Sequence, residues 1–64
     1  MHPVASSKKM QNGVVVFWQE GETEKSDLFT WEELIEAKIN ALDLLDNSHL
    51  YRIDPDGHKI IAYY

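Results

Sequence analysis

The sequence predicts one α+β domain in the order ββαββ, with two hairpins around a single helix. Three observations lead to this fold. The run Val14–Trp18 is β-branched and aromatic throughout, as in a strand. Thr30–Glu33 has the spacing of a helix capping box and precedes an apolar stripe of helical period. Asp54–Gly57 has turn composition and separates two further apolar runs.

The first hairpin is expected to join Val14–Trp18 to Thr23–Phe29 through a turn at Glu20–Glu22. Glycine in the middle of this turn can adopt the positive φ that tight turns require. The returning strand is mostly polar, which suits the edge of a sheet. Residues 1–12 show no periodicity, and we expect them to form a flexible arm before a domain of residues 13–64.

One helix is predicted from Trp31 to about Asp46. In the capping box the Thr30 hydroxyl would accept from the Glu33 amide, and the Glu33 carboxylate would accept from the Thr30 amide. Asn47 can end the helix because asparagine tolerates a left-handed conformation. The face expected to pack on the sheet has spacings of three and four and consists of Trp31, Leu34, Ile35, Ile39, Leu42 and Leu45.

The second hairpin is expected to pair Leu50–Ile53 with Lys59–Tyr64. A type I turn followed by a left-handed Gly57 gives a three-residue loop. This loop places Asp54 opposite His58, and the later pairs follow from that register.

The strand order follows from hydrophobicity. Val14–Trp18 and Ile60–Tyr64 are apolar at every position, and such strands are normally central. Placing them side by side predicts a four-stranded sheet of order 2-1-4-3, with the helix packed on one face. This arrangement is similar to the β-grasp fold, the layout of ubiquitin-like domains and of small immunoglobulin-binding bacterial domains. The resemblance rests on element order alone and implies no function.

A sheet of this kind would be apolar on both faces, and one helix about 10 Å wide can cover only one of them. Contiguous exposed apolar side chains mark interaction sites, and aromatic residues dominate binding energies. We therefore expect a small acidic interaction module or regulator that binds a protein partner, foremost a second copy of itself in a homodimer. The predicted contact residues are Trp18, Tyr51, Ile53, Ile61 and Tyr63.

Charge supplies an alternative function. The formal net charge is -5, which opposes direct binding to phosphate backbones. Seven of the eleven acidic residues lie between positions 20 and 36, one of them the capping residue Glu33. They could dock on a basic protein surface, as an inhibitor that mimics nucleic acid would. The residues predicted for this role are Glu20, Glu22, Glu24, Asp27, Glu32 and Glu36.

Other classes are not predicted. The chain has no cysteine, which excludes disulfides and thiolate zinc sites. His2, His49 and His58 are expected to lie apart, and Asp54–Gly57 has the residues of a turn, so we expect no metal and no cofactor. No nucleophile–base pattern or phosphate-binding loop is present, so no enzyme is expected. No apolar run reaches the length of a membrane span, and we expect a cytoplasmic protein.

Overall fold

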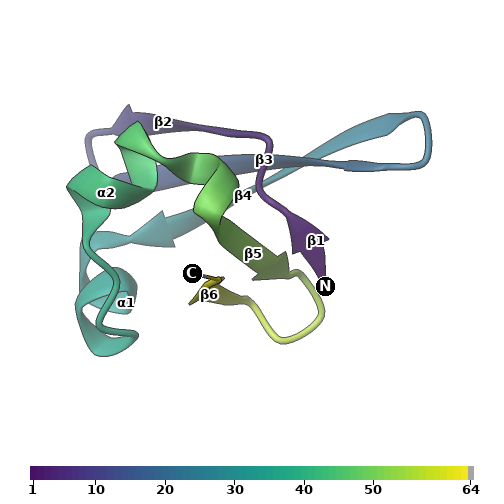
Figure 1. The fold of residues 1–64 in the computed structure, drawn as a ribbon. Helices are drawn as coiled ribbons and strands as arrows, with labels where there is room; N and C mark the ends of the chain where they lie inside the picture. Colours follow the sequence, from purple (N-terminus) through teal and green to yellow (C-terminus); the bar gives the residue numbers. More distant parts are fainter. Residues whose placement is uncertain (64) are drawn as a thin grey trace.

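The computed structural model describes residues 1–63 and contains two three-stranded antiparallel sheets and two short α-helices (Figure 1). The first sheet has the order β2–β3–β4, formed by Ser6–Met10, Gly13–Glu20 and Thr23–Thr30. The second has the order β1–β5–β6, formed by His2–Pro3, Tyr51–Asp54 and Lys59–Ala62. The predicted single four-stranded sheet of order 2-1-4-3 with one helix is therefore wrong.

The first hairpin is present as predicted. Strands β3 and β4 pair in register from Gly13 opposite Thr30 to Glu20 opposite Thr23, and Gly21 in the turn has a φ of 65°. The tip of this hairpin projects beyond the rest of the molecule, on the side opposite the helices (Figure 1).

Residues 1–12 are not a flexible arm in this structure. Strand β2 pairs with β3, and β1 pairs with β5. Between them the Val4 amide donates to Tyr51 at 3.0 Å and the Ala5 amide donates to Phe17 at 2.8 Å. The chain thus crosses from one sheet to the other at the buried side chain of Val4. The partner of the central strand β3 is therefore β2, where we had expected the last strand.

The predicted continuous helix is divided into α1 (Trp31–Glu36) and α2 (Ala41–Asp46). Its capping box is confirmed: the Glu33 amide donates to the Thr30 hydroxyl at 3.2 Å, and the Thr30 amide donates to Glu33 at 2.9 Å. Neither helix in residues 1–63 has the length and apolar content that a membrane crossing requires.

The break between the helices is a Schellman motif that has lysine in the left-handed position. Lys38 has a φ of 59°, its amide donates to Ile35, and the Ile39 amide donates to Leu34. Asn40 then caps α2 by accepting from the Asp43 amide at 3.1 Å. Because α2 starts in a new direction, the predicted apolar stripe is also divided.

The second hairpin forms with a register one residue away from the predicted one. Asp54 pairs with Lys59, Ile53 with Ile60, and Tyr51 with Ala62. The loop has four residues because His58, with a φ of 51°, belongs to it. A shift of one residue exchanges the faces of a strand. It turns the side chains of Tyr51 and Ile53 toward the interior.

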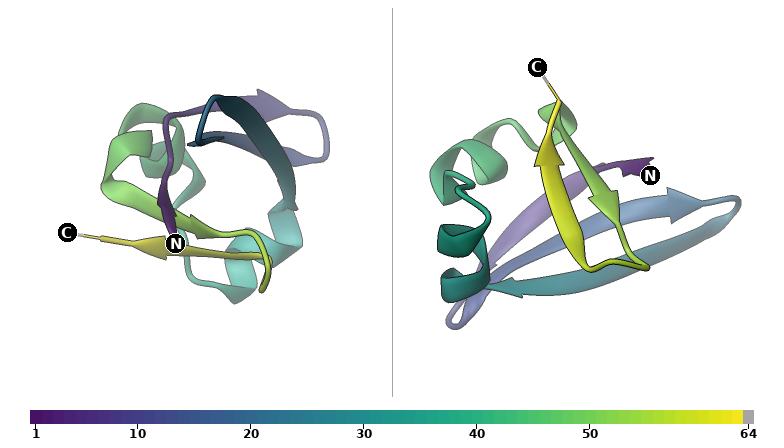
Figure 2. Two further views of the ribbon diagram at one scale, coloured as in Figure 1. Left: turned by 90° about the vertical axis from the view of Figure 1, so that its right-hand side faces the viewer. Right: turned by 90° about the horizontal axis from the view of Figure 1, so that it is seen from below.

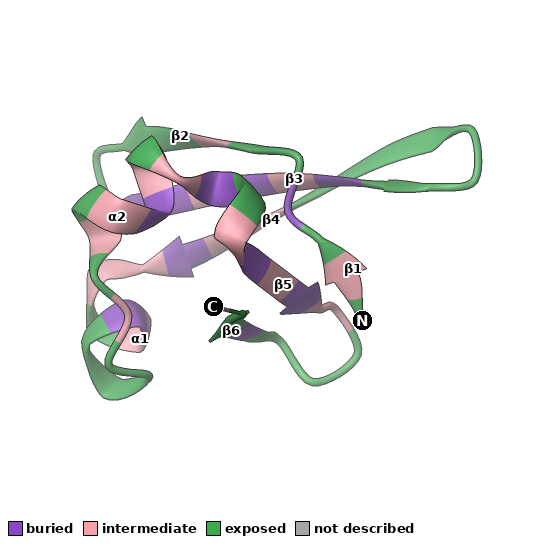
Figure 3. Cartoon of the chain, viewed as in Figure 1, coloured by how far each residue is buried: buried purple, intermediate pink, exposed green. Residues whose placement is uncertain are grey.

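The two sheets lie face to face around the core, and the helices lie at one end of both (Figure 2). Among the strands, β3 and β5 carry most of the buried positions (Figure 3). Buried side chains from both sheets and both helices form one cluster, made of Val4, Val14, Val16, Trp18, Phe29, Leu34, Leu44, Tyr51, Ile53 and Ile60. The second sheet covers the face of the first sheet that we had expected to be exposed to solvent.

Candidate functional site

A groove of about 270 Å³ lies between helix α1 and strand β6. We call it the α1–β6 groove. Its floor and walls come from Phe29 at the end of β4, from Glu33, Leu34 and Ala37 on α1, and from the segment His58–Ile61. Most of this lining is apolar. The capping box at Thr30 sets the direction in which α1 leaves β4, and thereby places this wall of the groove.

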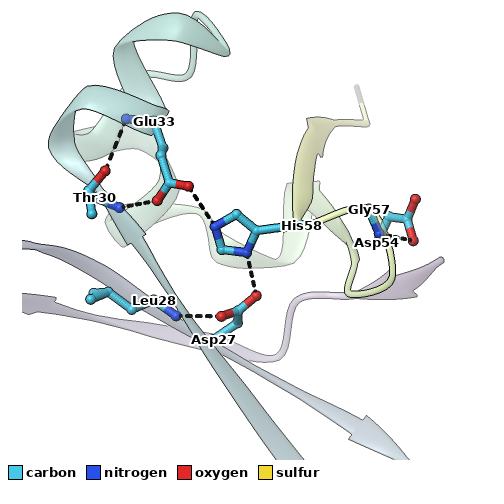
Figure 4. A network of polar contacts seen from close by, with 7 residues as sticks. All are labelled: Asp27, Leu28, Thr30, Glu33, Asp54, Gly57 and His58. Carbon is cyan, nitrogen blue, oxygen red and sulfur yellow. Dashed lines mark hydrogen bonds and ion pairs between the residues drawn. The ribbon is translucent and has the colours of Figure 1, made fainter.

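The groove lining includes an ion-paired histidine, His58, whose polar contacts are drawn in Figure 4. His58 Nδ1 lies 2.7 Å from Asp27 Oδ2 on β4, and His58 Nε2 lies 2.8 Å from Glu33 Oε2 on α1. The imidazole also stacks on Phe29 with ring centroids 4.2 Å apart. We call His58, Asp27 and Glu33 the histidine clamp, because they link the second hairpin to β4 and α1.

Each carboxylate of the histidine clamp is held by a backbone amide as well. Asp27 Oδ1 accepts from the Leu28 amide at 3.0 Å, and Glu33 Oε1 accepts from the Thr30 amide at 2.9 Å (Figure 4). Each therefore presents its second oxygen to the imidazole. Only the charged imidazolium can donate from both ring nitrogens at once, so this geometry favours the protonated form.

The pKa directions agree with the contacts. Burial lowers the pKa of His58, but the hydrogen bond to Asp27 and the charges of Asp27 and Glu33 outweigh it, so the pKa is raised above 6.5. The backbone hydrogen bond from Thr30 is the main reason that the pKa of Glu33 is lowered from 4.5, and burial opposes this shift.

The clamp has the chemistry of a structural link. Both ring nitrogens of His58 are engaged with carboxylates, so neither is free to take a proton from a substrate. Asp27 and Glu33 also lie on opposite sides of the ring and do not converge on one point that an ion could occupy. Within residues 1–63 no group of three histidine, aspartate or glutamate side chains has the geometry of a metal site.

The clamp predicts a pH dependence of stability. A raised pKa in the folded state means that the contribution of His58 is complete below pH 6.5 and is lost as the pH rises through the folded-state pKa. The lowered pKa of Glu33 means that its contribution is complete above pH 4.5 and is lost on further acidification. The His58 side chain is 39% exposed, so we expect a loss of only about 0.5 kcal/mol at alkaline pH.

Urea unfolding at pH 6 and pH 8.5 measures this loss, with His58→Asn as the matched control. Asparagine keeps the left-handed backbone accessible but removes the titrating ring. We expect the fall in unfolding free energy between the two pH values to disappear in the variant. An equal fall in both proteins would show that the clamp is not its source.

The predicted contact residues do not share one exposed face. Trp18, Tyr51 and Ile53 are buried in the core between the sheets. Only Ile61 and Tyr63 are exposed, at 41% and 62%. Ile61 lines the α1–β6 groove, while the Tyr63 ring lies under the Arg52 guanidinium at 4.5 Å. Partner binding through Ile61 and Tyr63 stays a prediction.

The predicted acidic residues lie in three places. Glu20, Glu22 and Glu24 are exposed at the tip of the β3–β4 hairpin, where Glu20 accepts from the Trp18 indole at 3.1 Å. Glu32 and Glu36 lie on α1 and are exposed. Asp27 is engaged by the histidine clamp. Docking of these residues on a basic surface stays a prediction.

Sequence reasoning missed both the groove and the clamp. The groove needs strand β6 beside the end of β4 and helix α1, and β6 is distant in the chain from these two consecutive elements. One signal was available for the helix break that shapes this region. Asn40 and Asp43 have the N-cap and N3 spacing of a new helix start, which argues against one helix through Ala37 and Asn40.

Comparisons of the chain with protein-family models, with curated proteins and with solved structures find no match.

Proposed function

We propose that this protein is a small interaction module that binds a segment of another protein in the α1–β6 groove. The observation that carries the proposal is the groove itself: an apolar hollow bounded by Phe29, Leu34 and Ala37, with the exposed side chain of Ile61 at its edge. Ligand sites are concave and mainly apolar with a few polar groups, and the polar residues of this lining are Glu33, His58 and Lys59.

The partner that we propose is a foreign protein. The apolar sheet face that suggested a homodimer is occupied by the core, and a net charge of -5 on each copy opposes self-association. The acidic mimic has less support. Two of its seven carboxylates, those of Asp27 and Glu33, are paired with His58, and the others are divided between the hairpin tip and α1.

Selection of peptides from a random library displayed on phage tests the proposal. We expect enriched peptides to bind Ile61→Lys at least about tenfold more weakly than wild type, a loss of about 1.4 kcal/mol. Leu42→Lys is the matched control, because Leu42 is an exposed aliphatic residue on α2 that does not line the groove. Its affinity should equal that of wild type.

Two results would contradict groove binding. One is an equal loss in both lysine variants, and the other is a library that yields no enriched peptide. Glu24→Lys separates the alternative function, since it changes the hairpin tip without touching the groove. It should leave peptide binding unchanged, whereas a loss of at least about tenfold would favour docking through the acidic hairpin.

A further inference from the structure

The three asparagines of the chain differ in how their side chains are held. They are Asn12, Asn40 and Asn47. Asn40 accepts from the Asp43 amide at 3.1 Å, and Asn47 donates to the Asp43 carboxylate at 2.8 Å. Asn12 is exposed in the loop between β2 and β3, and no residue within 1–63 forms a hydrogen bond with its side chain. The Asn12 amide is therefore open to solvent.

Asn12 is also followed by glycine, whereas alanine and serine follow the other two asparagines. The backbone nitrogen of the next residue can attack the carbonyl carbon of an asparagine side chain and close a cyclic imide, which makes asparagine a thermolabile residue. Glycine is the most reactive neighbour, because it has no side chain to obstruct the approach and its backbone is the least restricted. The pair Asn12–Gly13 is therefore the place where the sequence most favours this reaction.

The fold restrains the backbone on both sides of this pair. Gln11 and Asn12 form a two-residue loop, at the end of which Met10 lies opposite Gly13. The Trp31 indole donates to the Gln11 carbonyl at 2.9 Å. Gly13 is buried and lies so close to the backbone of β4 that a Cβ atom would not fit. Attack by the Gly13 nitrogen requires rotation of the peptide plane that precedes it, so the loop must first open locally.

The product of the reaction alters the main chain at the loop. In isoaspartate the main chain runs through the side-chain carbonyl, so the chain gains one methylene group before Gly13. Loop length and turn geometry set the register of a hairpin. Gly13 is held against β4, so the displacement falls on β2. None of the residues Ser6–Met10 is buried, and Ser7 holds this strand on α2 through a hydrogen bond to the Leu44 carbonyl. Strand β2 is therefore the element that the longer loop displaces.

We propose that Asn12 is a site of spontaneous deamidation, and that its isoaspartate product releases β2 from β3. The Gly13 nitrogen loses its proton to hydroxide and forms a bond with Asn12 Cγ, and the bond from Cγ to the side-chain nitrogen breaks. That nitrogen takes a proton from water and leaves as ammonia. Water then opens the imide at either of its two carbonyl groups, which gives isoaspartate or aspartate at position 12. Water is the only co-reactant.

Peptide mass spectrometry of the protein incubated at mildly alkaline pH locates the modification. We expect the mass increase of an amide-to-carboxylate conversion at Asn12, at a rate at least about tenfold above the rates at Asn40 and Asn47. In urea the rate at Asn12 should rise at least about tenfold, because the loop is no longer restrained. Trp31→Phe removes the donor to Gln11 and should raise the rate in the folded protein at least about twofold. Its rate in urea should equal that of wild type.

Amide hydrogen exchange, followed by NMR, measures what the product does to β2. The isoaspartate form is separated from the aspartate form by chromatography. We expect the amides of Ser6–Met10 to exchange at least about tenfold faster in the isoaspartate form than in wild type. Asn12→Asp is the matched control, because it carries the same added charge on an unaltered main chain. Its exchange at Ser6–Met10 should lie within about twofold of wild type.

Three results would overturn the proposal. The first is no conversion at Asn12, or conversion that is no faster there than at Asn40 and Asn47. The second is an equal rate at Asn12 in the folded protein and in urea, which would show that the loop does not restrain Gly13. The third is equal exchange of the β2 amides in the isoaspartate form and in Asn12→Asp, which would show that the longer main chain leaves β2 paired.

Discussion

Replacement of Gly13 by alanine is expected to destabilise the protein by roughly 3 kcal/mol or more. Gly13 is the buried first residue of β3, and it pairs with Thr30 on β4 and with Met10 on β2. A Cβ atom here would lie 2.8 Å from the Phe29 carbonyl carbon and from Thr30 Cα, and closer still to the Phe29 carbonyl oxygen. All three are backbone atoms, so the clash is relieved only by displacing β4 from β3.

Urea unfolding of Gly13→Ala against Gly21→Ala measures this effect. Gly21 has a positive φ but open space around the position of a Cβ, so alanine there should cost only about 1 kcal/mol. Domains of this size have a total stability of only several kcal/mol, and Gly13→Ala can leave the chain largely unfolded. Similar stabilities for the two variants would contradict the close approach of β3 and β4 at Gly13.

The second large effect is the loss of stability expected when Ile53 is replaced by alanine, in contrast to the same replacement at Ile61. In the predicted ββαββ sheet both lay on the exposed face. In the structure Ile53 is 0% exposed and packs in the core, while Ile61 is 41% exposed. Ile53→Ala should therefore destabilise the protein by roughly 2–5 kcal/mol. Ile61→Ala should cost less than about 1 kcal/mol, because little of its packing is lost.

Thermal unfolding of the two alanine variants under the same conditions checks the difference. A destabilisation of 1 kcal/mol lowers the midpoint by several degrees in a domain of this size, so even the lower expected value for Ile53→Ala is resolved. Equal and small shifts would support an exposed Ile53 and the predicted register. A larger shift for Ile61→Ala than for Ile53→Ala would reverse the assignment of faces.

The local elements were predictable where a short stretch of chain carries its own signal. The hairpin with Gly21 at its turn and the Thr30–Glu33 capping box are both present. In each the deciding contacts join residues close in the sequence. The start of α1, which forms one wall of the candidate site, was therefore predictable, although the groove beside it was not.

The wrong predictions concern segments without a clear local pattern, whose secondary structure depends on contacts with residues distant in the sequence. The segment Ser6–Met10 has no strand signal, yet it pairs with β3. Ser7 also donates to the Leu44 carbonyl at 3.1 Å, which docks β2 on α2. Helix α1 ends with Lys38 in the left-handed conformation, at a position where glycine is usual. The sequence therefore lacks the glycine that commonly indicates the end of a helix.

The register of the second hairpin shows how a small local error changes a functional prediction. A loop one residue longer than expected turned Tyr51 and Ile53 inward, and the predicted apolar face became part of the core. His58 was included in the loop, where its φ of 51° directs the ring toward Asp27 and Glu33. The α1–β6 groove forms because β6 is the edge strand of its sheet and lies next to α1 in this register.

By itself the sequence determined the acidic charge, the first hairpin and its turn, and the start of α1, because contacts within a few residues decide each of them. Only the tertiary structure decided that two sheets enclose the core, that residues 1–12 supply two strands, and that an apolar groove opens between α1 and β6. These depend on which distant segments bury each other's apolar surface. Several pairings of the same strands satisfy the local pattern equally well, and the packing of the whole chain selects among them.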